Sequence, residues 1–268
     1  MASLSLNTFN RSAWHGVDPD LPGQIRAAAA AGFPMIGPDR FSLDAWTASG
    51  RSLTDLRRLI DQAGLACSEI AAAFDLVGSR EETLAGARHA LQLADALGAP
   101  FVQTNSHLPV SPQSCDLFAE CARIVQPSGA KLAMEYLPFT PINTIATARA
   151  LVEHAGIAMS GIVVDSWHHW RGTDRAAELQ SLPSDRIAYV QFDDALPMVG
   201  DDLVQETIHR RTFPGDGEFD LPGFCAPLQA NGFDGIVSVE VLNLEWRERG
   251  DLGEFARRAY QGSRKFWR

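Results

Sequence analysis

The stretch Lys131-Leu132-Ala133-Met134-Glu135-Tyr136 is a short apolar run that ends on one carboxylate. A run of this length is typical of a strand that is buried on both faces. The pattern returns three times, in residues 161–165, 187–191 and 236–240, which end on Asp165, Gln191 and Glu240. If these strand ends meet in space, they offer three carboxylates and one amide oxygen, which are ligands that hard divalent cations prefer.

Outward from these strands, apolar runs alternate with helix-like segments along the whole chain. Capping residues such as Ser52 precede the helices, and glycines such as Gly98 follow them. The expected strands are residues 3–8, 33–37, 65–70, 100–105, 132–135, 161–165, 187–191 and 236–240. The expected helices are residues 21–31, 53–63, 80–97, 114–125, a segment from the N-cap Asn143 to Gly156, 174–182, 221–230 and 252–266. Residues 38–46 and 192–220 are expected to be loops.

Strict alternation of strands and helices predicts a parallel sheet with right-handed crossovers. Eight such units in 268 residues favour an α/β fold of the closed (β/α)8 type, a TIM barrel, over an open sheet. No break in composition divides the chain, so a single domain over residues 1–268 is expected. The first loops lack the GxGxxG and GxxxxGK[ST] motifs, which weakens a nucleotide-binding reading.

Composition excludes several other classes. A hydrophobic fraction of 46% with 21% charged residues is typical of a globular chain. The net charge of −10 argues against nucleic acid or an anionic membrane as partner, because either needs a basic face. No signal peptide and no apolar run near the ~20 residues of a membrane span is seen, so a cytoplasmic location is predicted. The cysteines, Cys67, Cys115, Cys121 and Cys225, show no CxxC pairing and are expected to be free buried thiols.

The four oxygen-bearing strand ends belong to neighbouring strands, the fifth to the eighth. In a parallel barrel the carboxyl ends of the strands meet at one rim, so Glu135, Asp165, Gln191 and Glu240 are expected to lie close together. Three carboxylates in one place repel each other unless a cation or protons neutralise them. Each side chain could instead cap a loop. An all-oxygen set points toward Mg²⁺ or Mn²⁺ and away from zinc.

The chain resembles the xylose-isomerase-like TIM barrels, also called the sugar phosphate isomerase/epimerase family, over nearly its whole length. The segments that carry the resemblance are Met134-Glu135, Asp165-Ser166-Trp167-His168, the strand end from Tyr189 to Asp194, the loop from Arg211 to Gly217, and Val239-Glu240. The resemblance implies one divalent metal, Mn²⁺, Mg²⁺ or Co²⁺, held at Glu135, Asp165, Gln191 and Glu240. Gln191 departs from the histidine that many members have. The endonuclease IV branch, which needs several histidines, fits less well.

The resemblance also implies roles around the metal. Glu135 and Glu240 double as acid and base in family epimerases, and a histidine placed like His168 contacts substrate or transfers protons in family dehydratases. Arg211 matches an arginine that holds a substrate oxygen, with Arg210 as the alternative one residue away. Trp14 and Trp167 are expected to pack on an apolar face of the substrate. For each of these residues a purely structural role is the competing reading.

Such a site suits enolisation, in which a polarised carbonyl makes the neighbouring carbon acidic. The first reading is a sugar isomerase or epimerase that acts on a small-molecule ketose or cyclitol. The alternatives are a dehydratase of a keto-cyclitol such as inosose or of a 3-dehydroshikimate-like acid, and a barrel that binds a polyol without turnover. Ala71, Ala72 and Ala73, taken as the end of the third strand, offer no arginine for a carboxylate and favour an uncharged substrate. Family members often dimerise through the barrel rim, but the composition does not decide whether this chain is a homo-oligomer.

Overall fold

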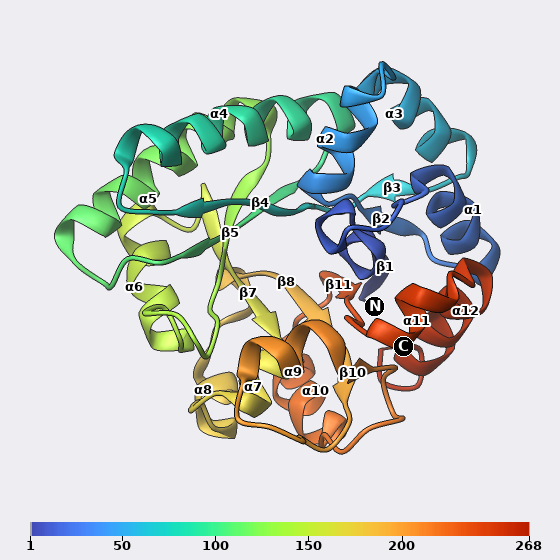
Figure 1. The fold of residues 1–268 in the computed structure, drawn as a ribbon. Coiled ribbons are helices and arrows are strands. Elements are labelled where there is room, and N and C mark those ends of the chain that lie inside the picture. Colours follow the sequence, from blue (N-terminus) through green and yellow to red (C-terminus); the bar gives the residue numbers. More distant parts are fainter. Residues whose placement is uncertain (1, 268) are drawn as a thin grey trace.

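The computed structural model describes residues 2–267, whose central strands form one parallel sheet that curls on itself (Figure 1). The sheet order is β3-β2-β1-β11-β8-β7-β6-β5-β4. The strands are β1 (Ser3–Asn7), β2 (Met35–Gly37), β3 (Ala66–Cys67), β4 (Ile70–Leu76), β5 (Phe101–Ser106), β6 (Lys131–Glu135), β7 (Ser160–Asp165), β8 (Ile187–Phe192) and β11 (Ile236–Val239). Because β3 and β4 follow each other in the chain, the two ends of the sheet are parts of one interrupted strand. The predicted TIM-barrel fold is confirmed.

Helices surround the sheet (Figure 1). They are α1 (Leu21–Ala31), α2 (Arg40–Ala48), α3 (Leu53–Gln62), α4 (Arg80–Leu97), α5 (Pro112–Val125), α6 (Ile145–Ala155), α7 (Ser166–Arg171), α8 (Ala176–Ser181), α9 (Leu203–His209), α10 (Leu221–Ala230), α11 (Leu244–Arg249) and α12 (Leu252–Ser263). The predicted boundaries of α1, α4 and α10 hold to the residue. Side-chain caps explain this agreement, since Asp20, Ser79 and Asp220 each accept a hydrogen bond from the first turn of their helix. No helix within residues 2–267 is both long and apolar enough to cross a bilayer.

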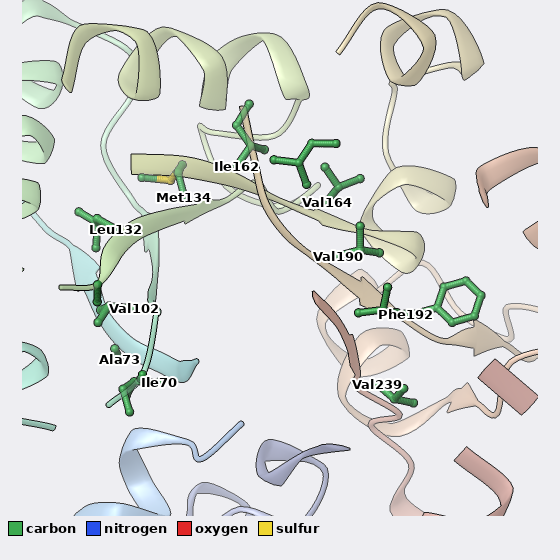
Figure 2. Close-up of a cluster of buried hydrophobic side chains, with 14 of the residues drawn as sticks. Ile70, Ala73, Val102, Leu132, Met134, Ile162, Val164, Val190, Phe192 and Val239 are labelled. Atoms are coloured by element: carbon green, nitrogen blue, oxygen red, sulfur yellow. The ribbon is translucent and has the colours of Figure 1, made fainter. Parts of the chain in front are cut away.

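The period-two alternation of the strands decides which side chains face the site. Leu132 and Met134 on β6, with Ile162 and Val164 on β7, belong to the apolar cluster between strands and helices (Figure 2). The residues between them, Ala133 and Val163, belong to a separate cluster with Tyr189 inside the barrel. The same alternation therefore turns Glu135 and Asp165, two residues further on, to the inner side of the sheet. All four cysteines are free and buried, as predicted.

The third strand differs most from expectation. It continues beyond the predicted end at Ile70 as β4, which runs to Leu76. The small side chains of Ala71, Ala72 and Ala73 gave a weak strand pattern, and the pairing of β4 with β5 is irregular between Ile70 and Phe74. These alanines therefore lie within the strand and not at its end, so the absence of an arginine there says nothing about the charge of the substrate.

Segments that were expected to be loops contain short helices at the carboxyl ends of strands. α2 begins within residues 38–46 and ends at Ala48, and α9 lies within residues 192–220 together with the two-residue strands β9 (Asp194–Ala195) and β10 (Arg211–Thr212). α7 begins directly after β7, and α11 begins after the four residues 240–243 that follow β11. Each of the four helices begins at a polar cap: Asp39, Asp165, Asp202 or Asn243. The prediction that Asn143 caps α6 is wrong, because Thr144 forms a reciprocal capping box with Thr147.

Ala72 has a left-handed backbone, with φ of 45°, in the middle of β4. Its N–H is held by Gln103 Oε1 at 2.9 Å. Because an alanine pays about 1–2 kcal/mol in this region and glycine does not, Ala72→Gly should raise the free energy of unfolding by roughly 0.5–1 kcal/mol. Urea unfolding measures this, with Ala73→Gly as control, since Ala73 has no positive φ and its replacement should destabilise the strand. A loss of stability in Ala72→Gly as large as in Ala73→Gly would show that Ala72 is not strained.

Candidate metal centre

The four oxygen-bearing strand ends converge at the carboxyl-end rim, the edge of the barrel where the strands finish. Gln191 Nε2 donates to Glu240 Oε1 at 3.0 Å. Arg211 Nη1 lies 3.0 Å from Asp165 Oδ2 and 3.3 Å from Glu240 Oε2. All of these side chains are buried, and so is Glu135. These side chains can interact because the carboxyl ends of β6, β7, β8 and β11 lie at one rim, as predicted.

His168 joins two of the carboxylates. Its Nε2 lies 3.3 Å from Glu135 Oε1 and 3.8 Å from Asp165 Oδ2. One ligand atom from each of these three residues lies within 4.8 Å of the others, a spacing that suits a single metal ion. The N-cap of α7 explains why the imidazole of His168 lies beside the strand end. Asp165 Oδ1 accepts a hydrogen bond from the His168 N–H at 2.9 Å, so the first turn of the helix brings the imidazole back toward Asp165.

Gln191 supplies a second sign of a cation site. Its Nε2 is used by Glu240, but its Oε1 is buried and has no hydrogen-bond partner in residues 2–267. A buried amide oxygen without a donor costs free energy, and an ion beside it would satisfy it. Within residues 2–267 the side chains whose ligand atoms lie close enough together for one divalent ion are Glu135, Asp165 and His168, and Glu240 lies outside this group.

Arg211 lies among these carboxylates and not in a solvated loop. It is 2% exposed, and its Nη1 also reaches Asp193 Oδ2 at 2.7 Å. Burial acts to raise the pKa of Asp165, but the charges of Arg211 and His168 outweigh it and hold that pKa below its ordinary value. For Glu240 burial dominates, together with the nearby carboxylates, and raises the pKa well above normal. The protonation of each carboxyl group in this cluster therefore depends on the charges of its neighbours.

The neighbouring arginine has a different environment. Arg210 lies at the end of α9, pairs with Glu206 at 3.0 Å and has a side chain that is 31% exposed. Of the two arginines between which the sequence left a choice, Arg211 is therefore the one in the cluster.

The two tryptophans occupy contrasting positions. Trp14, in the 3-10 helix η2 (Ala13–His15), is 46% exposed and lies edge-on to His15, with ring centroids 4.9 Å apart. Trp167 is completely covered; its ring stands edge-on to His168 at 5.4 Å and lies 5.5 Å from the guanidinium carbon of Arg211. Trp167 thus supports the site residues from behind, whereas Trp14 is open to solvent at the rim.

Asn7 is a site residue that sequence reasoning passed over. It ends β1, and its Nδ2 donates to Glu240 Oε1 at 3.1 Å. The available signal was the same one that singled out the other four, a polar side chain at the end of an apolar strand. Asn7 was missed because β1 is far from the others in sequence, although β1 pairs with β11 in the sheet.

Glu69 lies deeper inside the barrel, at the break between β3 and β4. Its Oε1 accepts from Ser238 Oγ, while its Oε2 is buried without a partner in residues 2–267. Gly37 on β2 makes the space, because a Cβ there would lie 2.1 Å from Glu69 Oε1. Burial raises the pKa of Glu69 to about 7.

Glu69→Gln should therefore stabilise the protein at alkaline pH. The stability that the protonated carboxyl contributes is complete below the unfolded pKa of about 4.3 and is lost as pH rises through 7. Glutamine imitates the protonated form at every pH. Unfolding in urea should give equal stability near pH 4 and a gain on the order of 2–4 kcal/mol for the variant at pH 8. The same difference at both pH values would contradict a buried titrating carboxyl.

Comparison with known proteins places this geometry in a family. The sequence matches the xylose isomerase-like TIM barrel family over residues 25–265. The 3-dehydroshikimate dehydratase of Pseudomonas aeruginosa is 32% identical over 233 residues, which cover 83% of this chain and 36% of that protein. The inosose isomerase of Halalkalibacterium halodurans is 28% identical over 137 residues, 50% of this chain and 48% of that protein. This chain thus spans only a little over a third of the length of the dehydratase.

Solved structures agree on the fold. A structure described as the IOLI protein with a binding zinc atom superposes with a TM-score of 0.84 at 19% identity, covering 98% of this chain and 97% of that one. The curated relatives named above are enzymes. Since the family match extends over most of the sequence and the barrel has the expected strand order, the chain belongs to the xylose isomerase-like TIM barrel family.

Proposed function

We propose that this chain is a divalent-metal-dependent dehydratase that removes water from a β-hydroxy ketone by enolisation. The observation that carries the proposal is the position of His168, a buried imidazole 3.3 Å from Glu135 and 3.8 Å from Asp165. An imidazole beside two carboxylates is a good general base, because the carboxylates stabilise the imidazolium that forms when it accepts a proton.

The residues that would hold the ion are Glu135 and Asp165, which form a metal-sized group with His168, and Gln191 and Glu240, which are hydrogen-bonded to each other on the same rim. When bound, the ion supplies Lewis acidity at a ketone oxygen. Oxygen donors favour Mn²⁺ or Mg²⁺, with Co²⁺ as a third candidate. Zinc stays among the ions to be tested, because an imidazole is within reach and because the structurally similar IOLI protein binds a zinc atom.

His168 performs the proton transfers in this proposal. Its imidazole takes the proton from the carbon next to the ketone; that C–H bond breaks, an N–H bond forms, and the electron pair passes into an enolate. As the enolate electrons form the carbon–carbon double bond, the bond from the β-carbon to its hydroxyl breaks. The hydroxyl takes the proton back from the imidazolium and leaves as water. The product is a conjugated enone, and no external oxidant is required.

The remaining site residues hold these groups in place. Arg211 positions Asp165 and Glu240 through its ion pairs, and Asn7 donates to Oε1 of Glu240. Trp167 packs edge-on against His168, which restricts the orientation of the imidazole. Burial of all these groups excludes water and strengthens their electrostatic interactions.

Isomerisation or epimerisation of a ketose is the second candidate. It is favoured by the placement of Glu135 at the end of β6 and of Glu240 directly after β11, because these strands are three apart in the sheet order and their carboxylates can approach a substrate from different sides. A pair of this kind can remove a proton on one face and return it on the other. Dehydration is preferred because the relative matched over 83% of this chain is a dehydratase, whereas the inosose isomerase matches over 50%.

The test is a substrate screen in D₂O with the Mn²⁺-loaded protein. The substrates are 3-dehydroshikimate, inosose and ketohexoses. NMR detects deuterium incorporation, and ultraviolet absorbance detects the conjugated product. A dehydratase gives a conjugated enone from inosose or an aromatic dihydroxybenzoate from 3-dehydroshikimate, which is itself an enone, and EDTA abolishes the reaction until Mn²⁺ is restored. Deuterium exchange with formation of an epimer and no enone would replace the proposal by the second candidate. Equal turnover with and without metal would overturn both, and a barrel that binds a polyol without reaction would give neither signal.

A further inference from the structure

An arginine without an acidic partner lies at the carboxyl-end rim. Arg247 belongs to α11, which follows β11 and Glu240, and it is 5% exposed. It makes no ion pair with any carboxylate in residues 2–267, and the one acid that affects its pKa is Glu248, next to it in the chain. Buried charges are normally paired, so an unpaired guanidinium in a chain of net charge −10 is unusual.

The contacts of Arg247 are to neutral groups on two other elements, α9 and η2. Its Nη1 donates to the Ile208 carbonyl at 2.8 Å, and its Nη2 lies 2.8 Å from His209 Nδ1. Its Nη1 also lies 3.4 Å from His15 Nε2. Because His15 Nε2 is 3.1 Å from the Phe9 carbonyl as well, this nitrogen cannot both donate to Phe9 and accept from Arg247. The contacts of the guanidinium with Ile208 and His209 are therefore the firm ones, and neither of these groups carries a negative charge that balances it.

The two histidines respond to this positive charge. Burial, with Arg247 beside it, lowers the pKa of His15 to about 4, and the same causes in the same order lower that of His209. Burial also lowers the pKa of Arg247, to about 10. In all three residues the pKa is lowered, which means that the positively charged form is disfavoured. This is expected where cationic side chains lie together without an anion beside them. An anion bound among them would oppose each of these shifts.

This cluster adjoins the metal centre. Thr207, next to Ile208 in α9, accepts from Arg211 Nη2 at 2.7 Å, and Arg211 reaches Asp165 and Glu240. On the other side, the Phe9 carbonyl that His15 contacts is two residues beyond Asn7, which holds Glu240. The cluster and the centre therefore lie on the same rim and share supporting elements.

We propose that Arg247, His15 and His209 form a binding site for the carboxylate of the substrate, which is then a hydroxy-keto acid and not a neutral sugar. This inference rests on the proposed function, which places the ketone at the metal centre. A guanidinium has two N–H groups on each Nη nitrogen, all in one plane; Arg247 uses one on each for Ile208 and His209, and a carboxylate is the anion that matches this planar geometry. A phosphate ester would call for a glycine-rich turn before a helix, and the sequence has none in its last units.

Isothermal titration with shikimate tests the site without turnover, because shikimate carries the carboxylate but no ketone. Arg247→Met should weaken shikimate binding at least tenfold and raise the KM for 3-dehydroshikimate at least tenfold, with a smaller change in kcat. His209→Glu, which places a carboxylate beside Arg247, should also abolish shikimate binding while raising the unfolding temperature. This second variant keeps the test decisive if Arg247→Met folds poorly. Arg249→Met, on the same helix but exposed and paired with Glu245, is the matched control and should bind as wild type does.

The outcomes separate this inference from the proposed function. Turnover of inosose by a protein that ignores shikimate would overturn the carboxylate site and keep the dehydratase. Arg247-dependent binding of shikimate without turnover of any ketone would support the site and overturn the dehydratase. Equal affinity in Arg247→Met and Arg249→Met would overturn the site, and so would displacement of shikimate by inorganic phosphate at a tenfold lower concentration.

Discussion

Replacing His168 with alanine should lower kcat by about 10² to 10⁴, the usual contribution of a general base. The imidazole is the one nitrogen base among the three groups that lie within 4.8 Å of each other, and its loss leaves the proposed proton transfer without an acceptor. Affinity for Mn²⁺ should change by less than about tenfold, because the four oxygen-bearing ligands remain. Steady-state kinetics at saturating Mn²⁺, together with a Mn²⁺ titration, separate these two effects.

The adjacent residue gives a matched control. His169 is also buried but packs on Phe224, with ring centroids 5.8 Å apart, and it makes no ion pair with the site carboxylates. His169→Ala should therefore retain kcat within about threefold. A rate for His168→Ala equal to that of His169→Ala would reduce His168 to a structural residue. A loss of Mn²⁺ affinity as large as the loss of rate would make it a metal ligand instead of a base.

Arg211→Met should destabilise the protein by about 3–5 kcal/mol, the typical cost of breaking a buried ion pair. The variant leaves Asp165, Asp193 and Glu240 buried without their shared guanidinium, and all three lie within 3.3 Å of it in the wild type. Urea unfolding of the metal-free protein measures the loss. Mn²⁺ should restore part of it, because a divalent ion can neutralise two of the same carboxylates.

Arg210→Met is the comparison for this variant. Arg210 pairs with Glu206 and has a side chain that is 31% exposed, so its loss should cost no more than about 1 kcal/mol. Equal stability of the two variants would contradict the view that Arg211 neutralises the cluster. A destabilisation of Arg211→Met that Mn²⁺ does not relieve would indicate that the carboxylates do not form one site with the ion.

The fold could be predicted from the sequence because its strands are buried on both faces. Runs such as residues 161–164 are continuously apolar, and helices such as α4 have a capping serine before them and a glycine after them. The convergence of Glu135, Asp165, Gln191 and Glu240 followed from one rule, that parallel strands of a barrel end at the same rim. No detail of packing was needed for either step.

Features that depend on tertiary packing could not be predicted. The third strand continues to Leu76 through three alanines whose pattern is also compatible with a loop, and α9 is short and polar enough to resemble one. The Arg247 cluster joins residues that are more than 200 positions apart, such as His15 and Arg247, and no local pattern announces it. The sequence analysis favoured an uncharged substrate because Ala71, Ala72 and Ala73 were taken as the end of the third strand, where no arginine could bind a carboxylate. These alanines lie inside β4.

The preference between reactions also changed. The sequence placed isomerisation or epimerisation ahead of dehydration, because family epimerases use glutamates like Glu135 and Glu240. The proposal of dehydration is supported instead by the position of His168 between Glu135 and Asp165, and by the match of 83% of this chain to 36% of the Pseudomonas aeruginosa dehydratase. Both reactions share the enolisation step, so the assignment of the metal ligands is the same for each.

Titration of the protein with Mn²⁺, followed by calorimetry, tests most directly whether these strand ends hold a cation. One Mn²⁺ should bind per chain, and Glu240→Gln should weaken it by at least about 100-fold, since loss of a group that only supports a ligand already costs 10- to 100-fold. Glu69→Gln, a buried carboxyl deeper in the barrel, should bind Mn²⁺ as the wild type does. Wild-type protein that takes up no Mn²⁺, Mg²⁺, Co²⁺ or Zn²⁺, or a Glu240→Gln variant with undiminished affinity, would contradict the account.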